Sequence, residues 1–159
     1  MTQRIIWPLL LLLLTACAAP RVARETVAEE AVAPATPTAD LDLRGGAAAL
    51  PGAEVGAGEP LIIVYPGETL FGTWAALPLA GGTGMLDPLA RFLAEHGASR
   101  WQGTVRAGTG VSPEYDLQLA EKRAELLGRY FGNRGIGSDR LWLRAEAGSG
   151  PTFELVQQN

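Results

Sequence analysis

Apolar residues follow two different patterns along the last hundred residues of the chain. Residues 61–65 are a β-branched run that predicts a strand, and the Pro66-Gly67 turn signal ends it. From 85 to 96 the apolar side chains recur with the period of an amphipathic helix: Leu86, Leu89, Ala90 and Leu93. The first part of this region is therefore predicted to be a strand followed by a helix.

A second helix is predicted over residues 113–131. Ser112 is a typical N-cap, Pro113 suits the first helical position, and Gly132 ends the pattern. Further strands are predicted at 101–107, 141–143 and 153–156. The order β-α-β-α-β-β indicates an α+β fold, in which two helices cover a small mixed sheet, within one domain spanning 60–159.

One charged residue interrupts the apolar row of the second helix. Four residues spaced by four lie on the same face: Leu119, Arg123, Leu127 and Phe131. An arginine in such a row either extends from the edge of the core to solvent or an ion pair, or is held there to bind a ligand. The spacing alone leaves both interpretations open.

The N-terminus has the features of an export signal. Arg4 precedes a short apolar run, which is too short to span a bilayer and ends at Leu14-Thr15-Ala16-Cys17. The Leu-x-Ala-Cys ending resembles the lipobox of bacterial lipoproteins. That resemblance implies a signal peptide over 1–16 and a lipid, such as palmitate, on Cys17. The alternative is a plain signal peptide that happens to contain a cysteine.

Residues 17–59 are predicted to be a flexible linker. They are rich in Ala, Pro and Gly and contain no aromatic residue, so they offer little apolar area to offset chain entropy. The two residues after Cys17 are Ala18 and Ala19, and neither is the aspartate that is associated with inner-membrane retention. The expected location is therefore the outer membrane, with the lipid as anchor and the domain in the periplasm.

Charge and composition disfavour several function classes. With 13 basic and 17 acidic residues the chain carries a net charge of −4, which argues against nucleic acid as a partner. The only histidine, His96, falls at the end of the first predicted helix, where a cation is a common capping feature. Acidic residues lack metal-ligand spacing. We expect no enzyme activity, no metal and no cofactor.

The second helix carries a family signature. The segment Tyr115-Asp116-x-x-Leu119-Ala120-x-x-Arg123-Ala124, with Gly135-Ile136 and Arg140-Leu141 after it, resembles the OmpA-like peptidoglycan-binding domain. The similarity extends from residue 61 to about 151. It implies that the domain recognises the zwitterionic diaminopimelate side chain of the peptide stem. In that family the arginine, here Arg123, clamps a carboxylate, and an aspartate in a Gly-His-Thr-Asp-like loop takes the ammonium group.

The chain departs from the family pattern at the ligand. Its loop reads Ala107-Gly108-Thr109-Gly110, so the position of the aspartate is a glycine. Asp116, where the family has asparagine, either supplies the missing carboxylate or simply serves the helix start. The Asn-Arg-Arg motif before the last strand is also absent. The candidate ligand residues are Arg123, Asp116, Thr109, Gly108 and Gly110.

Two functions remain open. In the first, the protein tethers the outer membrane to peptidoglycan without a covalent bond. In the second, the domain has kept the OmpA-like fold, has lost the ligand, and binds a periplasmic protein in an envelope assembly. The retained signature residues around Arg123 favour the first function, and the missing aspartate favours the second.

Overall fold

A computed structural model describes residues 37–158 of the chain, with side chains from residue 41 onward. The predicted signal peptide and Cys17 lie outside the described residues. Within this part, the elements follow in the order α1 (Pro37–Ala48), β1 (Glu54–Val55), β2 (Ile62–Tyr65), α2 (Gly82–Glu95), β3 (Arg100–Ala107), α3 (Pro113–Gly132), β4 (Leu141–Ala147) and β5 (Phe153–Gln158).

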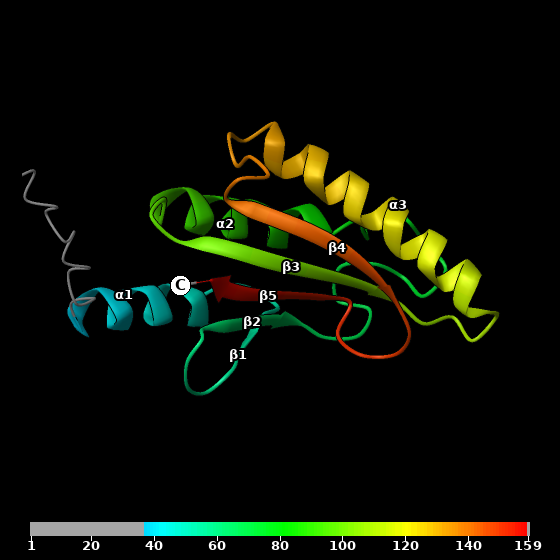
Figure 1. Ribbon diagram of the computed structural model, residues 1–159, viewed down its shortest axis with the longest axis horizontal. Helices are drawn as coiled ribbons and strands as arrows, with labels where there is room; N and C mark the ends of the chain where they lie inside the picture. The colour runs from blue at the N-terminus through cyan, green and yellow to red at the C-terminus, as the bar shows by residue number, and fades with distance from the viewer. Residues whose placement is uncertain (1–36, 159) are drawn as a thin grey trace, which may run out of the picture. The chain divides into compact units, whose positions relative to one another are not determined.

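The strands form one mixed sheet in the order β1-β2-β5-β3-β4 (Figure 1). β3 and β4 run parallel, whereas β5 pairs antiparallel with both β2 and β3. The parallel pair needs a long connection, and α3 supplies it. The last strand of the chain therefore lies in the middle of the sheet, where it joins the two halves.

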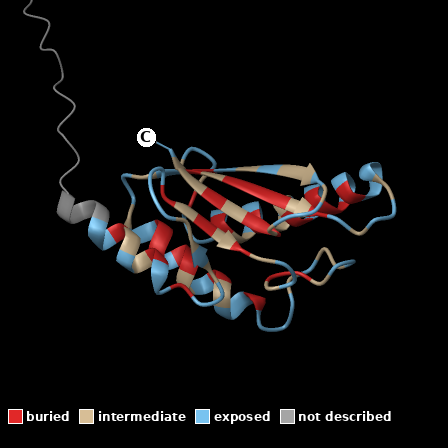
Figure 2. Ribbon diagram, turned by 90° about the horizontal axis from the view of Figure 1, so that it is seen from below, coloured by how far each residue is buried: buried red, intermediate tan, exposed pale blue. Residues whose placement is uncertain are grey.

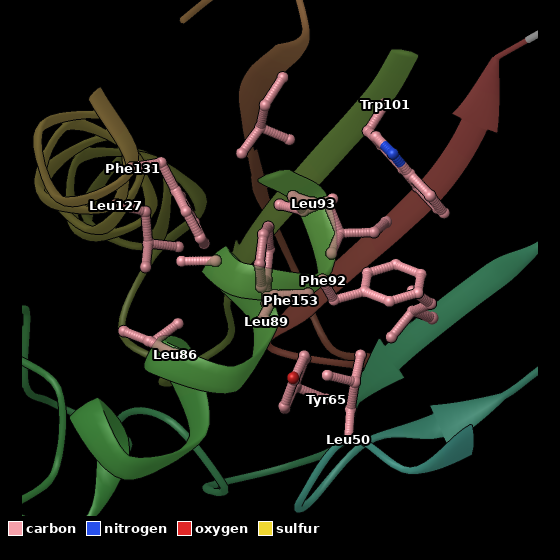
Figure 3. Close-up of a cluster of buried hydrophobic side chains, with 14 of the residues drawn as sticks. Leu50, Tyr65, Leu86, Leu89, Phe92, Leu93, Trp101, Leu127, Phe131 and Phe153 are labelled. Atoms are coloured by element: carbon pink, nitrogen blue, oxygen red, sulfur yellow. The ribbon is translucent and has the colours of Figure 1, made fainter. Parts of the chain in front are cut away.

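The main core lies between the sheet and the helices. Leu86, Leu89 and Leu93 of α2 and Leu127 and Phe131 of α3 gather near Phe153 of β5, as Figure 3 shows. All of these side chains are buried. Figure 2 colours the ribbon by burial, and buried positions, in red, recur along the strands and the helices. The apolar periods of the sequence thus correspond to the faces of α2 and α3 that face the sheet.

The other face of the sheet carries paired charges. Arg106 of β3 lies opposite Glu146 of β4, and their side chains form an ion pair of 2.9 Å. Glu146 also pairs with Arg144, and Glu154 of β5 lies 3.7 Å from Arg106. The two pairs of Arg106, with Glu146 and with Glu154, join neighbouring strands and stabilise the sheet modestly.

The predicted α+β fold is confirmed. α3 begins at Pro113, as expected, because the Ser112 side chain accepts a hydrogen bond from the backbone N–H of Tyr115. The predicted strands are present, and β4 and β5 run further toward the C-terminus than expected. Among the described residues, no helix combines the length and apolar character that crossing a membrane requires.

The domain begins earlier than the sequence predicts. Residues 37–59 contain α1 and β1, and Leu43, Ala47 and Leu50 belong to the buried core, so the predicted flexible linker is corrected over this range. Leu43 and Ala47 lie four residues apart on one face of α1, and Leu50 lies just beyond the end of the helix. Gly46 allows close packing on α2, since a Cβ there would lie 3.3 Å from the Phe92 ring.

Arg44 of α1 binds the turn between β1 and β2. Its guanidinium donates to the carbonyl oxygens of Gly56 at 2.7 Å and Gly58 at 2.5 Å, and it pairs with Glu59. These bonds connect the helix to the segment that leads into β2. A segment with little apolar area is thus ordered by a few specific long-range contacts.

Replacing Leu43 with alanine tests whether α1 belongs to the domain. Leu43 is 6% exposed, and its truncation should lower the free energy of unfolding by about 2–3 kcal/mol. Leu41→Ala is the matched control, because Leu41 lies on the same helix and is 73% exposed. Urea unfolding followed by circular dichroism measures both variants. If both substitutions changed the free energy of unfolding equally and only negligibly, the result would contradict the packing of α1 against the core.

Candidate functional site: a buried arginine and the pocket beside it

Arg123 lies in the middle of α3, on the face that packs against the rest of the domain. Its row on the helix contains Leu119, Leu127 and Phe131, and all four side chains are buried. Arg123 itself is only 3% exposed. The structure therefore excludes the interpretation in which this side chain extends from the core into solvent.

The guanidinium of Arg123 binds backbone carbonyls. Nε donates to Ala75 O at 2.9 Å, and Nη2 donates to Gly72 O at 2.7 Å and Thr73 O at 3.1 Å. Nη1 donates to Arg106 O at 2.9 Å, at the end of β3. Four hydrogen bonds from one side chain thus attach the loop after β2 to α3 and to the central sheet.

The charge of Arg123 has no direct counter-ion among the residues described here. No carboxylate oxygen in this part of the chain lies within ion-pair distance of it. Burial lowers the pKa of Arg123, and the negative charges of Asp116 and Glu68 oppose that shift from further away. The Phe71 ring, whose centroid is 5.0 Å from Arg123 Cζ, also stabilises the cation. A buried charge held only by dipoles and a ring attracts an anionic group.

A pocket of about 220 Å³ opens beside this arginine. Arg123 lines it together with Glu68 and Thr73, and the glycine-rich segment 148–150 forms part of its wall. The backbone N–H of Thr73 donates to Glu68 Oε1 at 2.9 Å, and the Thr73 hydroxyl donates to the same oxygen. One pocket therefore presents a guanidinium and an oriented carboxylate.

The predicted ligand residues are divided between this pocket and a neighbouring one. Arg123 and Gly108 line the arginine pocket, whereas Gly110 and Asp116 line the other. Gly108 is required by close packing, since a Cβ there would lie 2.7 Å from Gly148 O. Gly110 has a φ of 78°, in the left-handed region that favours glycine.

Asp116 holds the loop between β3 and α3. Its Oδ1 accepts hydrogen bonds from the Thr109 backbone N–H at 2.9 Å and from the Thr109 hydroxyl at 2.5 Å. The hydroxyl bond, then the backbone bond, lowers the pKa of Asp116, so this carboxylate is charged at neutral pH. Asp116 and Thr109 are therefore engaged with each other, outside the lining of the arginine pocket.

The sequence did not identify Glu68 and Thr73 as site residues. They lie about fifty positions before Arg123, in a loop with no distinctive motif. Four backbone carbonyls bind Arg123, and a carbonyl has no sequence signature. The Pro66-Gly67 turn signal after β2 marked this loop, but no pattern predicts that it folds back onto α3.

Other candidate chemistry is accounted for by local structure. His96 follows α2 as its C-cap residue, and its backbone N–H donates to Phe92 O at 3.1 Å. Its ring lies against that of Phe92, with centroids 4.7 Å apart. In the described range, His, Cys, Asp and Glu form no group of three or more that could hold a metal ion.

No protein-family model matches the chain, and no curated protein matches its sequence. Solved structures match its fold. A MotB-like protein from Desulfovibrio vulgaris is 15% identical, with a TM-score of 0.59 over 76% of this chain and 87% of the other. The cell wall anchor of the T6SS from Pseudomonas aeruginosa is 14% identical, with a TM-score of 0.50 over 66% and 86%.

A third structure, the peptidoglycan-associated lipoprotein from Burkholderia pseudomallei, is 20% identical, with a TM-score of 0.45 over 56% of this chain and 87% of the other. The similarities show the fold alone, and the OmpA-like fold predicted from the sequence is confirmed.

Arg123→Lys tests the structural role of the guanidinium. Lysine keeps the charge but cannot reach four carbonyls in one plane, so the free energy of unfolding should fall by about 2–3 kcal/mol. Arg129→Lys, on the same helix with a side chain 65% exposed, should change it by less than about 0.5 kcal/mol. Chemical denaturation gives both values. If Arg123→Lys left the free energy of unfolding unchanged, the carbonyl contacts would not be what holds the loop.

Proposed function

We propose that the chain is a cell-envelope lipoprotein whose OmpA-like domain binds peptidoglycan non-covalently, through the diaminopimelate side chain of the peptide stem. One observation carries the proposal: a buried arginine, without a carboxylate partner among the described residues, lines an open pocket. The family resemblance supplies the identity of the ligand. The likeness to solved structures supports the fold on which this site is built.

The pocket suits a zwitterionic side chain. The end of diaminopimelate carries a carboxylate and an ammonium group on one carbon atom. A guanidinium has five N–H groups, and Arg123 donates four of them to residues in the described part of the chain, which leaves one on Nη1 for the ligand carboxylate. Glu68 is the carboxylate that faces the ammonium group. Glu68 thus replaces the aspartate of the family, whose position in this chain is occupied by Gly110.

The remaining candidate residues shape the site. Asp116 orders Thr109 through two hydrogen bonds and so fixes the loop from Gly108 to Gly110. Asp116 was expected either to replace the family aspartate or to serve the start of the helix. Its bonds to Thr109 favour the second role, because they order the loop that leads into α3. Gly108 keeps the end of β3 close to Gly148, which forms part of the pocket wall. These residues position the wall of the pocket and leave contact with the charged ligand to Arg123 and Glu68.

A lipid on Cys17 would attach the protein to the outer membrane, with the domain in the periplasm. Since the chain is acidic, it is not attracted to the anionic lipids of a membrane surface. The attachment must therefore come from the covalent lipid on Cys17. Because α1 belongs to the domain, only the residues between Cys17 and Pro37 connect the two. Their full extension is at most about 70 Å.

One observation favours the second function. Arg123 donates most of its N–H groups to the chain itself, and the neighbouring loop exposes apolar side chains at Trp74, Leu77 and Leu79. If the pocket has lost its ligand, this loop is the surface on which the domain would bind a protein of the envelope. The binding experiment below separates the two functions.

Glu68→Gln tests the proposed ligand site. The exposed glutamine can still accept the bonds from Thr73, but it loses the charge that faces the ammonium group. Unlipidated chain 18–159 should sediment with purified diaminopimelate-type sacculi, and Glu68→Gln should weaken this binding about tenfold. Glu125→Gln, with a side chain 67% exposed on α3, is the control and should bind normally.

The outcome separates the alternatives. If the parent chain does not sediment with sacculi, the tether function is wrong, and the protein-binding function remains. If the parent binds and Glu68→Gln binds equally well, peptidoglycan is the ligand but Glu68 does not contact it.

Cys17→Ser tests the lipid anchor. In cells fed labelled palmitate, the parent chain should incorporate the label and fractionate with the outer membrane. The variant should incorporate none and leave the outer-membrane fraction, because serine has no thiol to carry the lipid. Label retained in Cys17→Ser would contradict attachment at this residue.

A further inference from the structure

We propose that Trp74 and Tyr115 form a second binding surface beside the pocket, where their rings stack on the sugars of the peptidoglycan glycan strand. This inference rests on the proposed function, because both sites bind the same polymer. The pocket takes the end of the peptide stem, and the aromatic pair takes the sugar chain that bears the stem.

The two rings are exposed and lie together. Trp74 is 58% exposed and Tyr115 is 40% exposed. Their ring centroids are 6.3 Å apart, and the ring planes are inclined by 51°. Trp74 comes from the loop after β2, and Tyr115 from the first turn of α3. Two segments distant in sequence thus bring aromatic rings to the same place on the surface.

The backbone beneath both rings is fixed. Trp74 lies between Thr73 and Ala75, and Arg123 binds the carbonyl oxygens of both neighbours. The N–H of Tyr115 donates to the Ser112 side chain at the start of α3. A rigid aromatic side chain loses little entropy when a ligand binds, so it is suited to be an anchor. The same arginine that lines the pocket therefore also holds Trp74 in an exposed position.

The position of Trp74 matches the covalent structure of the ligand. Thr73, its neighbour in the chain, lines the arginine pocket together with Glu68. A peptide stem of three residues spans about 10 Å when extended, and its first residue is attached to a sugar. With the third residue in the pocket, the sugar that bears the stem lies on the order of 10–15 Å from the pocket. Because Trp74 directly follows Thr73 of the pocket lining and its ring lies 6.3 Å from that of Tyr115, the aromatic pair is within reach of such a sugar.

The chemistry of the surface suits a sugar. An N-acetylated sugar is uncharged and presents a flat face of C–H groups, with hydroxyl groups around its edge. An aromatic ring accepts the C–H face, and the indole N–H and phenol O–H offer polar contacts beside it. Glu68 and Glu114 are exposed acceptors on the same two segments as the rings. A protein partner would instead use the wider apolar loop, including Leu77.

The test measures the binding of glycan strands from which all peptides have been removed. Chain 18–159 is titrated with these strands, and the indole N–H signals are followed by NMR. The Trp74 signal should shift, and Trp74→Ala should weaken binding about tenfold. Trp142→Ala is the matched control, because Trp142 is 56% exposed on β4, away from the pocket, and it should bind normally.

Two further variants separate sugar stacking from a general apolar contact. Trp74→Tyr keeps an aromatic face and should retain more binding than Trp74→Leu. Leu77→Ala should have no effect. If the parent chain does not bind the strands, or if Trp74→Ala binds as well as Trp142→Ala, the inference is wrong. It is also wrong if Leu77→Ala and Trp74→Leu weaken binding equally while Trp74→Tyr retains none.

A parallel titration distinguishes this inference from the proposed function. The free tripeptide L-Ala-γ-D-Glu-diaminopimelate should bind the parent and Trp74→Ala with the same affinity, and Glu68→Gln should bind it more weakly. Strand binding without tripeptide binding would overturn the pocket and keep the aromatic surface. Tripeptide binding without strand binding would keep the pocket and overturn the aromatic surface.

Discussion

The four hydrogen bonds of Arg123 are the interaction on which the site depends. They bring carbonyls from the loop after β2 and from the end of β3 to one point beneath α3. Leu70 and Phe71 anchor the start of this loop in the core, but its middle exposes Trp74, Leu77 and Leu79, and the bonds of Arg123 hold the backbone there. The pocket wall at Thr73 and the display of Trp74 both follow from this one side chain. A single cation thus has a structural role and, on the proposed function, a binding role.

The fold could be predicted from the sequence because its main elements have strong local signals. The helical period of α2 and α3 and the β-branched run of β2 bury their apolar sides as expected. α1 escaped prediction because its apolar residues are sparse and its sequence contains Gly45 and Gly46. Its order comes from contacts distant in sequence, such as Gly46 with Phe92, and these have no local pattern.

The site was predictable only in part, for a related reason. The apolar row of α3 pointed to Arg123, because a charge in such a row needs an explanation. Its partners are backbone carbonyls, which any residue could supply. The two interpretations of Asp116 could not be separated by spacing, since its contact with Thr109 depends on the shape of the loop. Glu68 reaches the pocket through a loop whose path is determined by tertiary structure.

The use of Arg123 in the fold limits how tightly the pocket can bind. A ligand carboxylate meets one free N–H, where an unoccupied guanidinium could offer a two-bond contact, so each stem should bind weakly. Weak binding is sufficient for a tether. The lipid would hold the domain near a polymer that repeats the same ligand, which raises the effective concentration, and a sugar contact beside each stem adds to it. An arginine shared between fold and ligand is therefore compatible with a tether that holds the wall through many reversible contacts.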